Sequence, residues 1–277
     1  MTKPERARRL WLGSFVMRPS SFLRHSSFEL RHFKESCRFV LEPSLTAPSS
    51  GKHRRRRPRV VGVITSPAEL DFAIRMNEPP DLLELRLDRL VRVIDRIENK
   101  ISRLRAPLVI TARHPMEGGA NRLSPLQRHN LLARFLSRAR YIDVELRSAP
   151  VFVSLLQLAR RRNVRRIISV HHLKSTPSPS RLRAQARAAK TYGADFFKVA
   201  TRTDTPMQLT RLIDFAVASD VGITVSAMGI GKLGAASRVL LACCGSALVY
   251  VSLGRSDIEG QMSLGQVRAL SFAALKG

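Results

Sequence analysis

The sequence predicts an α/β fold, a single (β/α)8 TIM barrel preceded by a basic N-terminal extension. Eight short apolar runs, often rich in β-branched residues, follow one another from residue 60 onward. Amphipathic segments of helical period separate them, and such strict alternation is typical of parallel strands covered by helices. The 277 residues leave room for a barrel of this kind, which typically needs about 250 residues and can be smaller.

The eight expected strands are the apolar runs at 60–65, 82–87, 107–113, 141–146, 166–171, 195–200, 222–227 and 247–253. The expected helices between them lie at 67–77, 124–140, 150–163, 178–193 and 205–220. Ser, Thr or Pro opens several of these segments and Gly193 closes one, as helix caps and starts require. In a barrel of this class the active site lies at the carboxyl ends of the strands, so functional side chains are expected there.

Residues 1–59 are set apart from the barrel at 60–277 by their composition. They lack periodicity, are rich in Ser, Pro and Arg, and end in the basic run HRRRRPR at 53–59. A solvated tail of low order is the expected structure, with an organelle transit peptide and an upstream extension before Met17 as alternatives. A secretory signal is not expected, because the apolar stretch LWLGSFVM is short and Arg18 follows it without a cleavage site.

The formal net charge of +27 raises the alternative of a basic nucleic-acid-binding protein. Only three tyrosines and one tryptophan are available to stack on bases, and no RNA-binding signature occurs, so a nucleic-acid partner is not the expectation. No apolar run approaches the ~20 residues of a membrane helix. The three cysteines, Cys37, Cys243 and Cys244, provide neither a disulfide framework nor a metal quartet, which suits a reducing compartment and predicts a cytoplasmic protein.

Two polar residues on neighbouring strands suggest a specific chemistry. Lys198 interrupts an apolar strand, and a lysine whose amine is neutral can attack a ketone to form a Schiff base. Desolvation and nearby guanidinium groups (Arg86, Arg113, Arg238) are expected to favour that neutral amine. His171 closes the preceding strand, where it can take a proton beside the imine and return it to a leaving hydroxyl. The pair predicts an α,β-elimination.

Five ordered motifs carry a family resemblance. The strings ELRLD (84–88), TARHPMEGG (111–119), SVHHLKSTP (169–177), GADFFKVA (193–200) and SAMG…GAASR (226–238) resemble, in order and spacing, the type I 3-dehydroquinate dehydratases. The resemblance runs from about residue 60 to 262. It implies dehydration of 3-dehydroquinate to 3-dehydroshikimate in the shikimate pathway, a hydro-lyase reaction on the route to aromatic amino acids.

The resemblance also implies roles for individual residues. Lys198 would form the imine, His171 would act as general base and then general acid, and Glu117 would orient His171. The substrate-binding residues implied are Glu84, Arg86, Arg113, Met228, Arg238, Gln261 and Ser256. The family uses no metal and no cofactor, and its members often form homodimers.

Three departures from the family pattern bear on these roles. One is the loop from Met228 to Arg238, which spans ten positions where the family commonly has eight. His172 stands where the family usually has Asp, which predicts a different hydrogen-bond network beside His171. The segment GRSDIEGQ at 254–261 resembles the family's substrate-covering loop, yet it carries Asp257 and Glu259. Acidic groups over a site for an anionic substrate are unexpected.

The stretch GIGKLGAASR at 229–238 allows a rival hypothesis. Gly229, Gly231 and Gly234 fit the G-x-G-x-x-G fingerprint of dinucleotide binding, which would make the protein an NADP-linked oxidoreductase. A doubly wound fold would need further βαβ units after this one, and the chain ends too soon. In a barrel the same loop follows the seventh strand, where an anion such as a carboxylate can bind.

Overall fold

The computed structural model describes residues 57–218 and 220–270, and within them eight parallel strands alternate with helices. The strands are β1 Arg59–Ile64, β2 Leu82–Arg86, β3 Leu108–Thr111, β4 Tyr141–Glu145, β5 Arg165–His172, β6 Phe196–Arg202, β7 Thr224–Ile230 and β8 Leu248–Ser252. Each strand begins and ends within three residues of the bounds predicted for it, so the predicted barrel is confirmed. Residues 1–56 of the basic extension expected at 1–59, among them Cys37, lie outside the described residues.

The strands form one sheet in the order β7-β6-β5-β4-β3-β2-β1-β8. The two ends of this sheet meet without a continuous ladder. The N–H of Ala247 donates to the carbonyl of Val225 at 2.9 Å, and the hydroxyl of Ser226 donates to the carbonyl of Leu248 at 3.1 Å. Ser246 bridges the same junction, because its hydroxyl accepts from the N–H of Ala227 at 3.0 Å. Side chains thus complete a nearly closed barrel.

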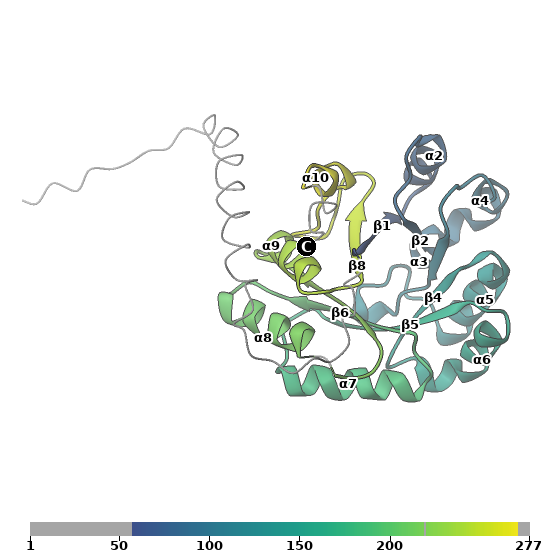
Figure 1. Cartoon of the computed structure of the whole chain (residues 1–277). Coiled ribbons are helices and arrows are strands. Elements are labelled where there is room, and N and C mark those ends of the chain that lie inside the picture. Colours follow the sequence, from purple (N-terminus) through teal and green to yellow (C-terminus); the bar gives the residue numbers. More distant parts are fainter. Residues whose placement is uncertain (1–56, 219, 271–277) are drawn as a thin grey trace, which may run out of the picture. The chain divides into compact units, whose positions relative to one another are not determined.

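Helices cover the outer face of the sheet, as Figure 1 shows for α5 to α8. The helices are α2 Pro67–Arg75, α3 Leu87–Leu90, α4 Ile94–Ile101, α5 Pro125–Phe135, α6 Val153–Arg161, α7 Pro179–Thr191, α8 Pro206–Val217, α9 Gly234–Cys243 and α10 Leu264–Ala269. Capping boxes start α5 at Ser124 and α8 at Thr205, and the hydroxyl of Ser178 caps α7. Gly193 follows α7 with φ +75°, the left-handed conformation that ends many helices.

The buried apolar residues of the described part of the chain form three clusters, the smallest of which packs α10 against β8. The other two lie on opposite faces of the sheet. The larger one lies between the strands and the surrounding helices and includes Leu83, Ile142 and Phe197. The smaller one fills the inside of the barrel and includes Tyr141, Phe196 and Leu248. Neighbouring residues of a strand point to opposite faces, so Phe197 packs outward while Phe196 packs inward. The polar side chains of the site lie above this inner cluster, toward the carboxyl ends of the strands.

Within the residues that the structure describes, no helix is both long and apolar enough to cross a membrane.

Candidate active site

One layer inside the barrel is polar and surrounds Lys198. Its side chains come from the even-numbered strands: Glu84 on β2, Asp143 on β4, Lys198 on β6 and Tyr250 on β8. Lys198 Nζ donates to Asp143 Oδ2 at 2.9 Å, lies 3.5 Å from Glu84 Oε1, and sits 3.8 Å from the centre of the Tyr250 ring. Layers of four side chains from alternate strands are usual in this fold, but they are normally aliphatic. Charged side chains in such a layer indicate a candidate active site.

The surroundings of Lys198 differ from the expectation in one respect. The side chain is buried, as predicted, with 3 % of its surface exposed. Its nearest charged neighbours, however, are the carboxylates of Asp143 and Glu84 and not guanidinium groups. The expectation that guanidinium groups surround this amine is therefore wrong, and two carboxylates take their place.

Asp143 links Lys198 to Arg113. The guanidinium of Arg113 lies 3.0 Å from Asp143 Oδ2 and 3.1 Å from Glu145 Oε1, and it donates to Ser169 Oγ at 2.7 Å. Burial alone would raise the pKa of Asp143, but Arg113 and Lys198 outweigh it and hold that pKa well below its usual range. Burial likewise opposes the charge of Arg113, yet Asp143 and Glu145 raise its pKa above the ordinary value. Both groups stay charged at neutral pH.

His171 ends β5 beside this charged group and is oriented by Glu117. Glu117 Oε2 accepts from the backbone N–H of His171 at 2.9 Å and lies 3.0 Å from its Nδ1. Burial lowers the pKa of His171 well below its ordinary value, and the positive charges of Arg113 and Lys198 act in the same direction. The ring is therefore neutral at pH 7. With Nδ1–H donated to Glu117, Nε2 keeps the lone pair of a general base.

Glu117 is itself perturbed. Burial, and after it the nearby charge of Glu145, raise its pKa to about 7 against the opposing charges of Arg113 and Arg147. The Nε of Arg147 lies 3.2 Å from Glu117 Oε1. A 3-10 turn at Pro115–Glu117 presents the carboxyl group to β5. Glu117 and His171, which are 54 positions apart in the sequence, are thus a hydrogen-bonded pair, as the prediction required.

Arg86 lies at the same end of the barrel, and its Nε and Nη2 groups already donate to protein atoms. Its Nε and one terminal nitrogen each donate to Asp88 at 2.9 Å, and the same terminal nitrogen donates to the carbonyl of Gly118 at 3.2 Å. Asp88 also accepts the backbone N–H groups of Arg113 at 3.1 Å and Ala120 at 2.9 Å. Arg86 and Asp88 therefore anchor the loop that carries Glu117.

Arg238 is the buried arginine whose charge is left uncompensated. Its Nη1 donates to the carbonyl of Tyr250 at 3.1 Å and lies 3.6 Å from Met228 Sδ, and its Nε donates to the carbonyl of Gly260 at 3.3 Å. Within the described part of the chain no carboxylate pairs with it, and burial lowers its pKa to about 10. A bound carboxylate would supply the missing counter-charge.

Comparison with known proteins agrees with this geometry. The sequence model of a family described as "Type I 3-dehydroquinase" matches residues 63–274. The chain belongs to the type I 3-dehydroquinase family. A hydro-lyase activity with a Schiff-base intermediate characterises this family, which also accounts for a buried lysine within the barrel.

Individual members of the family are similar over most of their length. The 3-dehydroquinate dehydratase of Methanothermobacter thermautotrophicus is 30% identical over 208 residues, covering 74% of this chain and 91% of that protein. The corresponding protein of Pyrococcus abyssi is 31% identical over 191 residues, covering 69% and 86%. The crystal structure of 3-dehydroquinate dehydratase from Geobacillus kaustophilus superposes with a TM-score of 0.71 at 25% identity, covering 79% of this chain and 91% of that one.

The two acidic residues of the loop at 254–261, which were unexpected over a site for an anionic substrate, pair with arginines. Asp257 pairs with Arg89 at 3.2 Å and its side chain is 73% exposed. Glu259 pairs with Arg202 at 3.0 Å. Both acids are thereby neutralised by surface arginines. Ser256 instead donates to Gln261 Oε1 at 2.7 Å, so the two substrate-binding residues predicted in this loop are in contact.

The glycine-rich stretch that suggested a dinucleotide enzyme serves this loop, and the oxidoreductase hypothesis has no support. Backbone N–H groups that would cradle a diphosphate donate to protein acceptors: Gly231 to Glu259, Lys232 to Asp204, Leu233 to Thr203 and Gly234 to Gly231. A Cβ on Gly234 would lie 2.9 Å from the Cα of Gly260. The glycines are needed because two backbone segments approach closely there.

His172 does not take part in the network around His171. Its Nε2 lies 3.0 Å from Gln185 Oε1 on α7, on the outer face of the sheet. Alternation along the strand turns its ring away from the barrel interior. The expectation that it would alter the hydrogen bonds of His171 is therefore wrong, and Glu117 and Arg113 surround that ring instead.

Two side chains beside Lys198 escaped the sequence-based prediction, Asp143 and Tyr250, whereas Glu145 was expected among the polar residues at the strand ends. Asp143 and Glu145 follow Tyr141 at intervals of two on β4, and all three point inward. A strand with polar residues at every second position near its carboxyl end is the signal that could have identified Asp143. The partners of each residue could not be read from that pattern.

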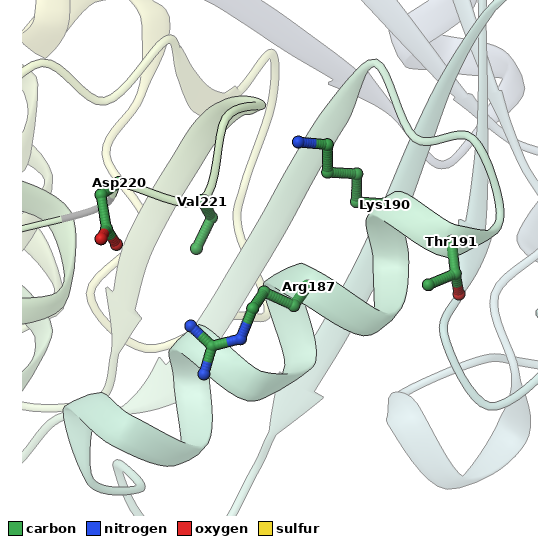
Figure 2. A pocket seen from close by; sticks show the side chains of 5 residues that line it. All are labelled: Arg187, Lys190, Thr191, Asp220 and Val221. Carbon is green, nitrogen blue, oxygen red and sulfur yellow. The ribbon is translucent and has the colours of Figure 1, made fainter.

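A surface cavity lies away from these residues. Figure 2 shows it between the end of α7 and the segment that precedes β7, lined by Arg187, Lys190, Thr191, Asp220 and Val221. The carboxyl end of α7 leads into the amino end of β6, so this cavity is at the opposite end of the barrel from His171. It has no connection with the candidate active site.

Proposed function

We propose that the chain dehydrates 3-dehydroquinate to 3-dehydroshikimate through an imine on Lys198. The observation that carries the proposal is a buried lysine amine in the same barrel end as a neutral histidine held by a glutamate. Membership of the type I 3-dehydroquinase family supplies the reaction. The shikimate pathway, which leads to aromatic amino acids, is the corresponding metabolic context.

Imine formation begins with transfer of one proton from the Lys198 ammonium to His171. The neutral amine then adds to the ketone carbon, and the carbonyl π pair moves onto oxygen. This oxygen takes one proton from the attached nitrogen and a second from the protonated His171, and it leaves as water. The nitrogen lone pair forms the C=N bond, so a positively charged iminium remains on Lys198.

Elimination uses the iminium as an electron sink. His171 removes a proton from the carbon next to the C=N bond, and the C–H electron pair forms an enamine. The enamine pair then expels the β-hydroxyl group, which takes the proton back from His171 and leaves as water. Addition of water to the remaining iminium releases the enone product and restores the Lys198 ammonium with which the cycle began.

The remaining residues are proposed to bind the substrate. Arg238, which lacks a counter-charge, would hold the substrate carboxylate through its two-pronged guanidinium. Glu84, Arg86 and Arg113 would contact the ring hydroxyls, and Met228 would pack beside the imine. Gln261 and Ser256 would cover the substrate from the loop at 254–261. Glu117 would keep His171 in the tautomer that leaves Nε2 free.

We further propose a homodimer, a cytoplasmic location, and a division into residues 1–59 and a barrel at 60–277. The family resemblance supports the dimer, and the low cysteine content supports a reducing compartment. Light scattering on the whole chain measures the oligomeric state, and a cooperative unfolding transition of residues 57–277 would show that the barrel folds without the extension. A monomer would contradict the first proposal.

Trapping with borohydride tests the proposed function. The protein is incubated with 3-dehydroquinate, reduced, and weighed as intact chain and as peptides. We expect an adduct on the peptide that contains Lys198, and none in Lys198→Ala. Lys190→Ala is the matched control, because Lys190 is exposed and far from the site, and its adduct should equal that of the unsubstituted chain. Absence of any adduct together with absence of enone absorbance would contradict the proposed function.

A further inference from the structure

The hydroxyl group of Tyr250 makes no hydrogen bond that would stabilise the folded barrel. The side chain is 96 % buried, and its hydroxyl is the one buried side-chain polar atom of the described residues without a hydrogen-bond partner. An unpaired buried hydroxyl is costly, because the group loses its hydrogen bonds to water and gains none in return. Such a group inside an active-site barrel points to a bound partner that appears during the reaction.

The position of Tyr250 is tied to the reacting lysine. The centre of its ring lies 3.8 Å from Lys198 Nζ. Its backbone pairs with Val61 of β1, and its carbonyl accepts from Arg238 at 3.1 Å. The residue therefore connects the lysine proposed to form the imine with the arginine proposed to hold the substrate carboxylate.

The other hydroxyl groups around Lys198 already donate to protein atoms. The hydroxyl of Thr111 donates to Glu84 Oε1 at 2.7 Å, and the hydroxyl of Ser169 donates to Asp143 Oδ1 at 2.6 Å. Glu84 and Asp143 present only acceptors when ionised. Burial and the charges of Glu84 and Asp143 raise the pKa of Tyr250 well above its ordinary value, so its hydroxyl keeps its proton. It is the donor in this layer that remains available.

We propose that Tyr250 is a further catalytic residue that acts in imine formation on Lys198. Its hydroxyl donates a hydrogen bond to the former carbonyl oxygen while that oxygen is leaving the substrate carbon. Its ring stabilises the positive charge that the nitrogen carries in the iminium, by a cation–π interaction. No proton is transferred to or from Tyr250, so the proton balance among Lys198, His171 and the departing water is unchanged. The inference rests on the proposed function.

The test compares Tyr250→Phe, which removes only the hydroxyl, with Tyr250→Leu, which removes the ring as well. Imine formation is followed in a single turnover by quenching with borohydride at successive times and weighing the chain. We expect Tyr250→Phe to slow this step by about 100-fold, as loss of one donor to a developing oxyanion does. Tyr250→Leu should slow it by roughly a further ten-fold, since the cation–π contact is also lost.

Tyr141→Phe is the matched control. Tyr141 lies in the inner apolar cluster on β4, and its hydroxyl accepts from Arg59 at 2.6 Å, remote from the reacting nitrogen. This substitution removes a partnered hydroxyl and should lower the Tm while leaving the rate of imine formation unchanged. Tyr250→Phe removes an unpartnered hydroxyl and should leave the Tm unchanged or raise it.

The outcomes separate this inference from the proposed function. If the unsubstituted chain forms no adduct, the proposed function itself fails. If it forms the adduct and Tyr250→Phe forms it equally fast, the hydroxyl takes no part in the reaction and only this inference is overturned. A Tyr250→Phe variant that fails to fold would overturn it as well, because the hydroxyl would then be needed for the structure. If Tyr250→Phe forms the adduct slowly and its Tm is not lowered, the inference is supported.

Discussion

His171 and Glu117 show how burial sets the properties of single residues in this site. Removing a histidine from water disfavours its charged form, and removing a carboxyl group from water disfavours its charged form too. The first effect lowers the pKa of His171, and the second raises the pKa of Glu117 to about 7. The group that titrates near neutral pH is therefore the glutamate, although a histidine is the usual candidate.

This assignment predicts the pH dependence of activity. In the unsubstituted chain, kcat/KM should show an inflection near pH 7, because ionised Glu117 is the better acceptor for Nδ1–H of His171. Glu117→Gln should remove this inflection, since the amide does not titrate. Initial rates between pH 5 and pH 9 measure both profiles. An inflection near pH 7 that persists in Glu117→Gln would assign the titration to another group.

The same shift predicts a pH dependence of stability with a definite sign. The carboxyl group of Glu117 titrates near 4.5 in the unfolded chain and at about 7 in the folded one. Between these values the folded state binds more protons, so its stability falls as the pH rises through that window, by at most about 3 kcal/mol. Urea unfolding at pH 5 and pH 8 measures this change. The free energy of unfolding should fall less between the two pH values in Glu117→Gln than in the unsubstituted chain. The His171 contribution has the opposite sign and is common to both proteins.

At the scale of elements, the loop at 254–261 is held against the segment that links β7 to α9. Gly231 N–H donates to the carbonyl of Glu259 at 2.9 Å, and Arg238 on α9 donates to Gly260. Gly260 has φ +76°, and a Cβ there would lie 2.4 Å from the carbonyl oxygen of Gly231. Backbone contact therefore places Ser256 and Gln261 near Arg238.

Gly260→Ala should displace this loop. We expect KM for 3-dehydroquinate to rise by roughly ten-fold or more, because the clash with Gly231 moves Gln261 away, and we expect a lower Tm. Gly245→Ala is the control, since Gly245 also has a left-handed φ of +100° but has no atom within 4 Å of the added Cβ. It should lower the Tm by strain alone and leave KM unchanged. Equal KM values in the two variants would mean that the loop does not bind substrate.

At the scale of the whole molecule, barrel closure depends on side chains at one junction. β7 and β8 share no continuous ladder, and the hydroxyl of Ser246 accepts from the N–H of Ala227 and donates to its carbonyl at 3.1 Å. Ser246 is buried, so its removal leaves a backbone N–H without a partner. Met228, which follows Ala227, would lose part of its support.

Ser246→Ala should therefore destabilise the protein by about 1–3 kcal/mol, the cost of an unsatisfied buried donor. The urea midpoint should fall while the m-value stays constant, because the surface exposed on unfolding hardly changes. Ser102→Ala provides the comparison, since the Ser102 hydroxyl donates to the carbonyl of Asn99 at an exposed site. An equal effect of both substitutions would show that the junction carries no special share of the stability.

Local sequence patterns were enough to predict the eight strands, the helix starts at Ser124, Ser178 and Thr205, and the family. These features depend on periodicity and capping within a few neighbouring residues, and the family depends on motifs in a fixed order. The same local information placed Lys198 and His171 on adjacent strands.

Which side chains meet inside the barrel follows from the three-dimensional fold and not from local sequence. The contacts of Lys198 with Asp143 and with the Tyr250 ring join positions that are distant in the chain. Their contacts depend on strand tilt and register around a closed barrel, which no local pattern encodes. For the same reason the glycines at 229–234 could resemble a phosphate-binding loop, until the close approach of Gly260 showed which backbone groups they accommodate.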